Sequence, residues 1–323
     1  MRILFITSSR IGDAVLSTGL LAHLLERHPG ARVTVVSGPE PAELFAAVPG
    51  LERVIRLVKG PGSLHWLRLW LSCVGRRWDL VVDLRGSAVA WLLPAAARRV
   101  KRGGLGQGHM IRQLARVLDL DVPPESRVWV TREQEAAAAL LVPPGTPVLG
   151  VAPVANWRGK EWRAASFVEL IRRLVGEGGI LPGGRVAVFG AADERARAGP
   201  VLESVPRERL IDLVGRVDLP TAYLCLGRCA FFVGNDSAPM HLAAAAGTPT
   251  LGLFGPSRHE LYAPWGRATA VVRTPESYEE LIGRPGYHRL RTDTLMDGLS
   301  VDAAERAARA LWTGQDALLR DAS

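Results

Sequence analysis

Short apolar runs alternate with helix-length segments along the whole chain, and this alternation limits the possible folds more than any other feature of the sequence. Short runs rich in leucine or β-branched residues predict buried strands, and the segments between them carry apolar residues at helical spacing. Such an order is typical of βαβ units, which build parallel sheets. We therefore expect an α/β fold with strands at residues 3–7, 32–37, 53–58, 80–84 and 99–102, and again at 148–151, 185–189, 210–213, 230–233 and 250–254.

The length of 323 residues exceeds what one ordinary hydrophobic core supports. The segment VPPGTPV, residues 142–148, contains residues that break regular structure and predicts a linker. We expect two domains, residues 1–146 and 147–323, with an amphipathic closing helix at 301–319. In open parallel sheets, ligands bind beyond the carboxyl ends of the strands, so functional residues are expected directly after each strand.

The net charge of +8 is concentrated in the first half of the chain. Residues 1–146 hold 19 basic and 12 acidic residues, a net of +7, whereas the remainder holds 21 and 20, a net of +1. This asymmetry suits an anionic partner such as a phosphorylated glycolipid, a membrane surface or nucleic acid. The alternative is that the many arginines reflect only the base composition of the gene. A nucleic-acid partner is not expected, because no RNP, KH or helix-turn-helix pattern accompanies the charge.

The sequence predicts a cytoplasmic protein. It has no run of about 18 uncharged apolar residues, and its first residues, MRILFITSSR, lack the apolar core of a signal peptide. The segment LHWLRLWLSCVGRRW, residues 64–78, mixes tryptophan with arginine and could contact an anionic inner membrane peripherally. The alternative is an ordinary helix whose tryptophans are buried. The three cysteines lack metal or disulfide spacing and are expected to be buried thiols.

The segment after the first strand, SSRIGDAVLSTG, contains Gly12 and Asp13. Gly12 permits a tight turn from strand to helix, and Asp13 stands at or beside the start of that helix. Asp13 has two interpretations: it caps the helix, or it takes a proton from an acceptor hydroxyl as a general base.

Two candidates follow strands of the second half. Lys160 is the only lysine after the linker in a chain that uses arginine for its surface charge, which favours a phosphate contact over a solvated surface position. Asp193 or Glu194 follows the next strand. A carboxylate there can accept hydrogen bonds from ribose hydroxyls. Alternatively, it only interacts favourably with the positive end of a helix dipole.

The stretch GNDSAPMHLAAAAG, residues 234–247, places more polar residues at the start of a helix than capping requires. Asp236 and Ser237 stand at its N-terminus, whose unpaired N–H groups form an anion site, and His241 follows one turn later. No His, Cys or Asp cluster has metal-ligand spacing, so no protein-held metal is expected.

Four segments together resemble glycosyltransferase family 9, the heptosyltransferases of the lipopolysaccharide inner core: GDAVLSTGLLAHLLERHPGARVTVV, WDLVVDLRGS, WRGKEWRAASFVELIRRL and VGNDSAPMHLAAAAGTPTLGLFGPS. The resemblance spans residues 2–257. It implies a GT-B architecture, with two Rossmann-like parallel-sheet domains facing a cleft, acceptor on the first and nucleotide sugar on the second, and a C-terminal helix that crosses back. It also implies metal-independent, inverting transfer from ADP-heptose to a lipid-linked or glycan acceptor, without a further cofactor.

The resemblance also implies roles for individual residues. Asp13 matches the catalytic base, and Lys160 matches the ligand of the donor diphosphate. The other residues of the implied donor site are Gly12, Glu194, Asp236, Ser237, Ala238, Met240 and His241.

The chain departs from the family pattern at Gly19, where the first motif commonly has proline, and at Ala238, where the family usually has glycine. Residues 255–299 match no motif, although APWG, residues 263–266, is a candidate contact for donor or acceptor. A GT-B transferase for another nucleotide sugar and a non-catalytic nucleotide-sugar-binding protein remain alternatives.

Overall fold

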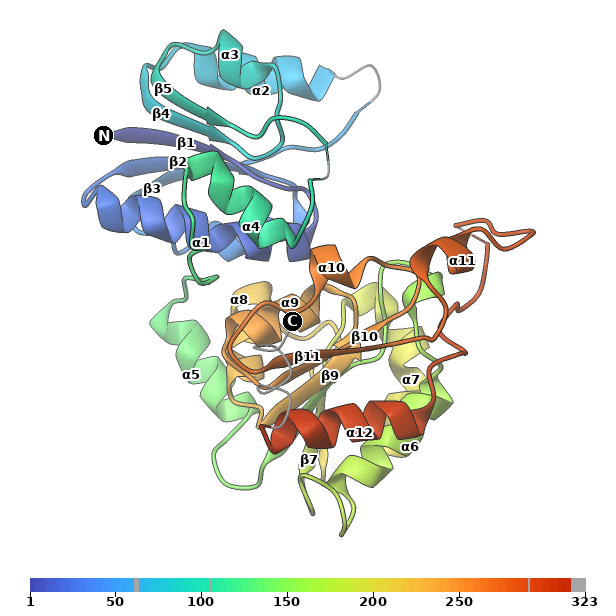
Figure 1. Ribbon diagram of the computed structural model, residues 1–323. Coiled ribbons are helices and arrows are strands. Elements are labelled where there is room, and N and C mark those ends of the chain that lie inside the picture. The colour runs from blue at the N-terminus through green and yellow to red at the C-terminus, as the bar shows by residue number, and fades with distance from the viewer. Residues whose placement is uncertain (61–63, 105, 290, 315–323) are drawn as a thin grey trace. The chain divides into compact units, whose positions relative to one another are not determined.

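The computed structural model describes residues 1–60, 64–104, 106–289 and 291–314, and its chain forms two compact units, Met1–Thr131 and Arg132–Ser323 (Figure 1). The units divide before helix α5 (Arg132–Leu141), earlier than the predicted boundary at 146/147. The reason is that α5 packs on α8 (Leu219–Gly227), where the Gln134 side chain donates to Asp218 at 2.8 Å. The proline-rich segment 142–148 therefore lies inside the second unit, between α5 and the first strand of its sheet.

The first unit is a five-stranded parallel sheet in the order β3-β2-β1-β4-β5. Helices α1 and α4 lie on one face of this sheet and α2 and α3 on the other (Figure 1). Central β1 is apolar in consecutive positions because both of its faces are covered, and Ile3 to Ile6 are fully buried. The elements are β1 (Arg2–Ile6), α1 (Ile11–Arg27), β2 (Arg32–Ser37), η1 (Glu40–Phe45), β3 (Leu51–Arg56), α2 (Leu64–Val74), β4 (Trp78–Asp83), α3 (Val89–Leu92), β5 (Ala95–Val100), α4 (Met110–Ala115) and η3 (Arg116–Leu118).

The second unit is a six-stranded parallel sheet in the order β11-β10-β9-β6-β7-β8. Its core joins apolar residues of the strands to the inner faces of α6, α7 and α12. Besides α5 and α8, the elements are β6 (Val148–Ala152), η4 (Arg158–Lys160), α6 (Ala164–Val175), β7 (Arg185–Val188), η5 (Ala192–Glu194), α7 (Arg195–Ser204), β8 (Leu210–Asp212), β9 (Phe231–Asn235), α9 (Ala238–Ala245), β10 (Thr250–Phe254), α10 (His259–Tyr262), β11 (Thr269–Arg273), α11 (Tyr278–Ile282) and α12 (Val301–Trp312).

The predicted α/β fold with two parallel sheets is confirmed, and every predicted strand is present with bounds shifted by a few residues at most, β5 most of all. One edge strand, β11, was not predicted. The predicted closing helix is α12, which ends at Trp312 and packs on α6, β10 and β11 of its own unit. Residues 315–319 of that prediction lie outside the described residues.

Both sheets have the strand order of dinucleotide-binding folds, in which the chain leaves two central neighbouring strands in opposite directions. This switch point lies between β1 and β4 in the first unit and between β6 and β9 in the second. Loops that follow these strands border a crevice where such sheets bind ligands. The predicted site residues must therefore be compared with these two positions.

Candidate active site

The switch point of the second unit is bridged by an ion pair. Lys160 ends the 3-10 turn after β6, and Asp236 directly follows β9. The Lys160 Nζ lies 2.5 Å from Asp236 Oδ2, with the lysine side chain 21% exposed and the aspartate 6%. Both residues were predicted in the donor site, and the structure shows that they form an ion pair with each other.

Asn235, the last residue of β9, fixes the loop that carries Lys160. It is fully buried, accepts a hydrogen bond from the Trp162 backbone N–H at 3.1 Å and donates to the Pro153 carbonyl at 2.9 Å. These bonds join both ends of the loop after β6 to β9. Asn235 therefore holds the loop in place, and the apparent excess of polar residues in this stretch is partly structural.

The N-terminus of α9 opens beside the same pair. Its N-cap is Ser237, whose side chain makes no capping hydrogen bond, and Ala238 is the first helical residue. His241 is 5% exposed, and its Nε2 lies 3.9 Å from Asp236 Oδ1. Met240, predicted to line the donor pocket, is fully buried, with its sulfur packed toward Gly252 of β10. It contributes to the core beneath the helix.

Three buried polar atoms at this edge of the sheet have no hydrogen-bond partner among the described residues: Trp157 Nε1, Ser237 Oγ and Ser257 Oγ. They follow β6, β9 and β10, which are adjacent strands. Buried polar groups in proteins are almost always paired. A bound group with its own donors and acceptors would satisfy them, which makes this edge of the sheet a candidate place for a polar ligand.

Glu194, the predicted ribose contact, lies in η5 after β7. Its Oε2 accepts a hydrogen bond from the Ala191 N–H at 2.8 Å, and its Oε1 lies 3.9 Å from Arg197. Arg197 also bonds to Glu161 and to the Ala155 carbonyl, which ties this turn to the Lys160 loop. Burial raises the pKa of Glu161, against the opposing effects of the Ala155 N–H and Arg197. Asp193, the competing candidate, is exposed.

A segment without any sequence motif covers the Lys160 loop. The Thr294 hydroxyl donates to the Glu161 carbonyl, Asp293 pairs with Arg158 at 3.1 Å, and Asp297 pairs with Arg163 at 2.5 Å. These contacts connect residues more than 130 positions apart, so no local pattern could have revealed them. The APWG segment packs toward β10 and α9, because Pro264 lies near Gly252 and Gly266 near the Ala244 carbonyl.

Asp13 lies in the first turn of α1, beyond the end of β1 at the switch point of the first unit. The N-cap is Arg10, so Asp13 stands inside the first turn of the helix, where a carboxylate interacts favourably with the positive end of the helix dipole. Ser8 donates a hydrogen bond to Asp13 at 3.3 Å. Gly12 does not adopt a positive φ, so the turn does not depend on glycine there as the sequence suggested.

Sequence reasoning missed the role of Asp83, on the other side of this switch point. It ends β4, is paired in register with Ile6 of β1, and is fully buried. Its carboxylate accepts from the backbone N–H groups of Arg85, Gly86 and Ser87 and from the Ser87 hydroxyl. Asp83 thus builds the loop that borders the crevice opposite Asp13. Its position at the end of a predicted strand was the available signal.

Comparison with known proteins agrees with this geometry. The family model for glycosyltransferase family 9 (heptosyltransferase) matches residues 108–281, more than half of the chain. This range includes Lys160, Glu194 and the residues at the start of α9.

The chain belongs to glycosyltransferase family 9. It is therefore a transferase, and its fold is GT-B. Lipopolysaccharide heptosyltransferase 2 of Salmonella typhimurium is 27% identical over 337 residues, covering 92% of each chain. Lipopolysaccharide heptosyltransferase 1 of Pseudomonas aeruginosa is 28% identical over 309 residues, covering 83% of this chain and 82% of the relative.

Solved structures of this glycosyltransferase family have the same fold. A family 9 glycosyltransferase from Veillonella parvula superposes with a TM-score of 0.76 at 20% identity, covering 97% of both chains. The E. coli ADP-heptose lipopolysaccharide heptosyltransferase II superposes with a TM-score of 0.72 at 22% identity, covering 98% of this chain and all of its own.

Neither a metal site nor a membrane-spanning helix is found among the residues that the structure describes. No group of three or more His, Cys, Asp or Glu side chains is arranged to hold a metal ion. No helix is long and apolar enough to cross a membrane.

Proposed function

We propose that this protein transfers a heptose, or a related sugar, from ADP-heptose to a lipopolysaccharide core or another glycan acceptor. The names of its relatives support the sugar and the acceptor class. An E. coli heptosyltransferase with the same fold has been solved with ADP, which supports the nucleotide. We further infer that the reaction takes place in the cytoplasm, next to the inner membrane that carries the lipid-linked acceptor.

The observation that carries this proposal is the Lys160–Asp236 pair at the N-terminus of α9, beside three buried polar atoms without partners. An ammonium has three N–H donors, and Asp236 uses one of them. The remaining donors, together with the free N–H groups of the helix N-terminus, suit the oxygens of a diphosphate. Asp236 then orients Lys160, and the unpartnered side chains are available to the sugar and the nucleotide.

The proposed reaction is a single in-line displacement with inversion at the anomeric carbon. An acceptor hydroxyl attacks that carbon and gives its proton to Asp13, while the bond to the diphosphate breaks and its electron pair leaves with the phosphate oxygen. Lys160 stabilises the charge that develops on this oxygen. One preorganised donor of this kind lowers the barrier by roughly 3 kcal/mol.

Turnover with a panel of ADP-, UDP- and GDP-sugars tests the donor, with nucleotide release as the readout. ADP-heptose should be turned over and the others should not. Inactivity with every ADP-sugar, together with turnover of another nucleotide sugar, would support the alternative GT-B transferase.

The variant Asp13→Asn tests the base. We expect turnover to fall by at least about a hundredfold, because general base catalysis contributes roughly 10²–10⁴-fold. The affinity for ADP should stay the same. Unchanged turnover would remove Asp13 from the base role, and ADP binding without turnover in the wild type would favour a non-catalytic binding protein.

We also propose that the lysine and the helix N-terminus replace a metal ion in stabilising the leaving group. Activity should then survive EDTA and gain nothing from added Mg²⁺ or Mn²⁺. Loss of activity in EDTA that either ion restores would overturn this part of the proposal.

A further inference from the structure

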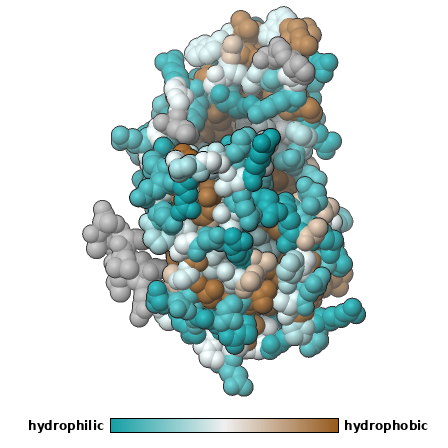
Figure 2. All heavy atoms as spheres, turned by 90° about the vertical axis from the view of Figure 1, so that its right-hand side faces the viewer, coloured by the Kyte–Doolittle hydropathy of each residue, from teal (hydrophilic) through white to brown (hydrophobic). Residues whose placement is uncertain are grey.

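Exposed apolar side chains concentrate on one face of the first unit. Six of the eleven large hydrophobic residues that are exposed in the described chain lie in α2, in α3 or shortly before α2. Figure 2 shows hydrophobic side chains, in brown, at the surface of the end of this unit that carries α2 and α3 in Figure 1. We call this surface the α2–α3 face, and its apolar members are Leu64, Leu67, Leu71, Trp91 and Leu92, each more than half exposed.

The spacing within α2 explains why these leucines face outward. Leu64, Leu67 and Leu71 recur at helical spacing and form a stripe, while Leu69 and Cys73 face the core. The two helices are tied together, because the Trp70 indole N–H donates to the Leu92 carbonyl at 3.1 Å. The stripe of α2 and the exposed residues of α3 therefore belong to one continuous surface.

The segment of the chain that carries these apolar residues is rich in basic residues. Residues 57–118 contain 11 basic and 2 acidic residues, a net of +9. Two of these arginines pair with carboxylates just outside this range, Arg76 with Glu52 at 2.6 Å and Arg99 with Asp119 at 3.5 Å. Of the two carboxylates within the range, Asp83 is buried and bonded, and Asp79 accepts a hydrogen bond from the Arg2 N–H. Arg68 is exposed within the leucine stripe, where its aliphatic stem can lie along apolar groups while its charge reaches lipid phosphates.

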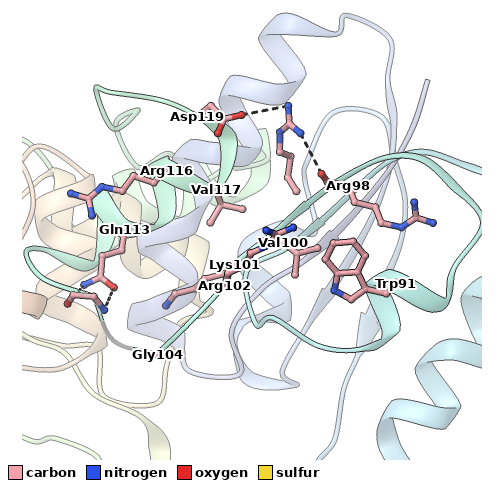
Figure 3. Close-up of a pocket in the computed structure, with 12 residues that line it drawn as sticks. Trp91, Arg98, Val100, Lys101, Arg102, Gly104, Gln113, Arg116, Val117 and Asp119 are labelled. Atoms are coloured by element: carbon pink, nitrogen blue, oxygen red, sulfur yellow. Dashed lines mark hydrogen bonds and ion pairs between the residues drawn. The ribbon is translucent and has the colours of Figure 1, made fainter.

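A pocket of about 440 Å³, lined by five basic residues and one carboxylate, Asp119, adjoins the α2–α3 face at Trp91, and we call it the cationic pocket. Trp91 of α3 lies on one side of the pocket and Arg116 on the other, with Lys101 and Arg102 between them (Figure 3). The Arg102 guanidinium lies 5.8 Å from the centre of the Trp91 ring, so an exposed aromatic group and a cation meet at the rim. Lys101 has the Met110 sulfur as its hydrogen-bond partner, at 3.7 Å, which leaves its ammonium well suited to an anion.

We propose that the α2–α3 face docks the protein on an anionic phospholipid bilayer. The leucines and Trp91 enter the interface between headgroups and acyl chains, while Arg68, Arg102 and the cationic pocket bind headgroup phosphates. A second copy of the chain is the other candidate occupant of an apolar face. A second copy fits less well, because a two-fold dimer would place the positive surface of one copy against that of the other, and like charges repel.

This inference goes beyond the transfer reaction, and its test requires no turnover. The purified full-length protein is sedimented with vesicles of phosphatidylcholine and phosphatidylglycerol, and separately with phosphatidylcholine alone. We expect binding to the anionic vesicles, much weaker binding to the neutral ones, and loss of binding as salt is raised. Failure to bind the anionic vesicles at low salt would overturn the proposal.

Two pairs of variants locate the docking surface. Leu67→Glu combined with Leu71→Glu should weaken vesicle binding by at least about tenfold, because both leucines enter the apolar interface. Leu140→Glu in α5 is the matched control, since Leu140 is 84% exposed in the second unit and should keep wild-type binding.

The second pair tests the charge. Arg68→Glu changes two charges, and each basic residue at an anionic surface contributes roughly fivefold to binding, so a loss on the order of 25-fold is expected. Arg207→Glu, at an exposed position of the second unit, is the control. All variants should keep the wild-type melting temperature. Equal losses in variants and controls, or variants that abolish a dimer without affecting vesicle binding, would contradict the assignment.

Discussion

The Lys160–Asp236 pair supplies the sharpest prediction, because removing the lysine should affect stability and catalysis differently. Lys160→Ala leaves the Asp236 carboxylate, only 6% exposed, without its cation. Breaking a fully buried pair costs about 3–5 kcal/mol, since an uncompensated charge stays behind. Lys160 is 21% exposed, so water can reach the site. We therefore expect a loss of about 2–3 kcal/mol in the free energy of unfolding.

The catalytic effect should be separable from this loss. Removing one preorganised donor from the leaving group should lower kcat by about 150-fold, which corresponds to about 3 kcal/mol of barrier. The double variant Lys160→Ala with Asp236→Ala contains no stranded carboxylate. We expect its stability to return to within about 1 kcal/mol of the wild type, because removing both partners is far cheaper than removing one, while kcat stays low.

Urea unfolding measures the stability of the two variants and of the wild type, and nucleotide release from ADP-heptose measures kcat. Lys160→Arg is the control for charge, and it should retain stability and only part of kcat, since a planar guanidinium does not replace a compact ammonium. A double variant as unstable as Lys160→Ala, or a Lys160→Ala enzyme with kcat near the wild type, would refute the reasoning.

Three further predictions rest on single contacts. In Gly38→Ala the new Cβ would lie 2.6 Å from the Ser9 Cα, so the loop leading to Asp13 must shift; we expect a loss of about 1–3 kcal/mol in stability and reduced kcat. Gly178→Ala, where no atom lies within 4 Å, is the control in urea unfolding and kinetics. Ser237→Ala should leave the melting temperature unchanged, because the side chain makes no capping bond, yet weaken ADP binding by calorimetry about tenfold; lost stability with unchanged affinity would contradict this. The two neighbouring arginines of α6 lower the pKa of Glu169 to about 2 from 4.5. A depressed carboxyl pKa stabilises the folded state above the unfolded value, so the difference in melting temperature between wild type and Glu169→Gln should be full near neutral pH, shrink between about pH 4.5 and 2, and decrease with salt; a difference independent of pH would exclude the ion pairs as its source.

Most of the fold could be predicted because its signals are local. Strands such as β2 and β10 are apolar runs between loop residues, and their bounds match the prediction. The exceptions lie at sheet edges. Strand β5 begins with three alanines, which carry little strand signal, and β11 lies in a region without any motif. An edge strand is buried on fewer sides, so its sequence is less constrained by the core.

The candidate site could be predicted only in part. Lys160 and Asp236 were identified from unusual residue choice and from their place after strands, but the bond between them joins positions 76 residues apart. Asn235, which the sequence analysis did not single out, fixes the Lys160 loop. Met240 stays a predicted donor residue, and the structure shows that its side chain is fully buried. Sequence spacing shows which residues share a helix end but not which way each side chain points.

The sequence by itself determined the two parallel sheets, the family and the strand ends at which polar residues gather, because apolar periodicity and motif spacing are properties of neighbouring residues. Only the tertiary structure decided which polar side chains are already satisfied and which are not. The side chains of Asp83 and Asn235 are hydrogen-bonded within their own unit, whereas Ser237 Oγ and Trp157 Nε1 are buried atoms without a hydrogen-bond partner among the described residues. It also decided that the leucines of α2 face outward and that Trp91 of α3 lines a pocket rich in basic residues. Hydrogen bonding and burial depend on segments that meet only after folding, so a single sequence does not contain them in readable form.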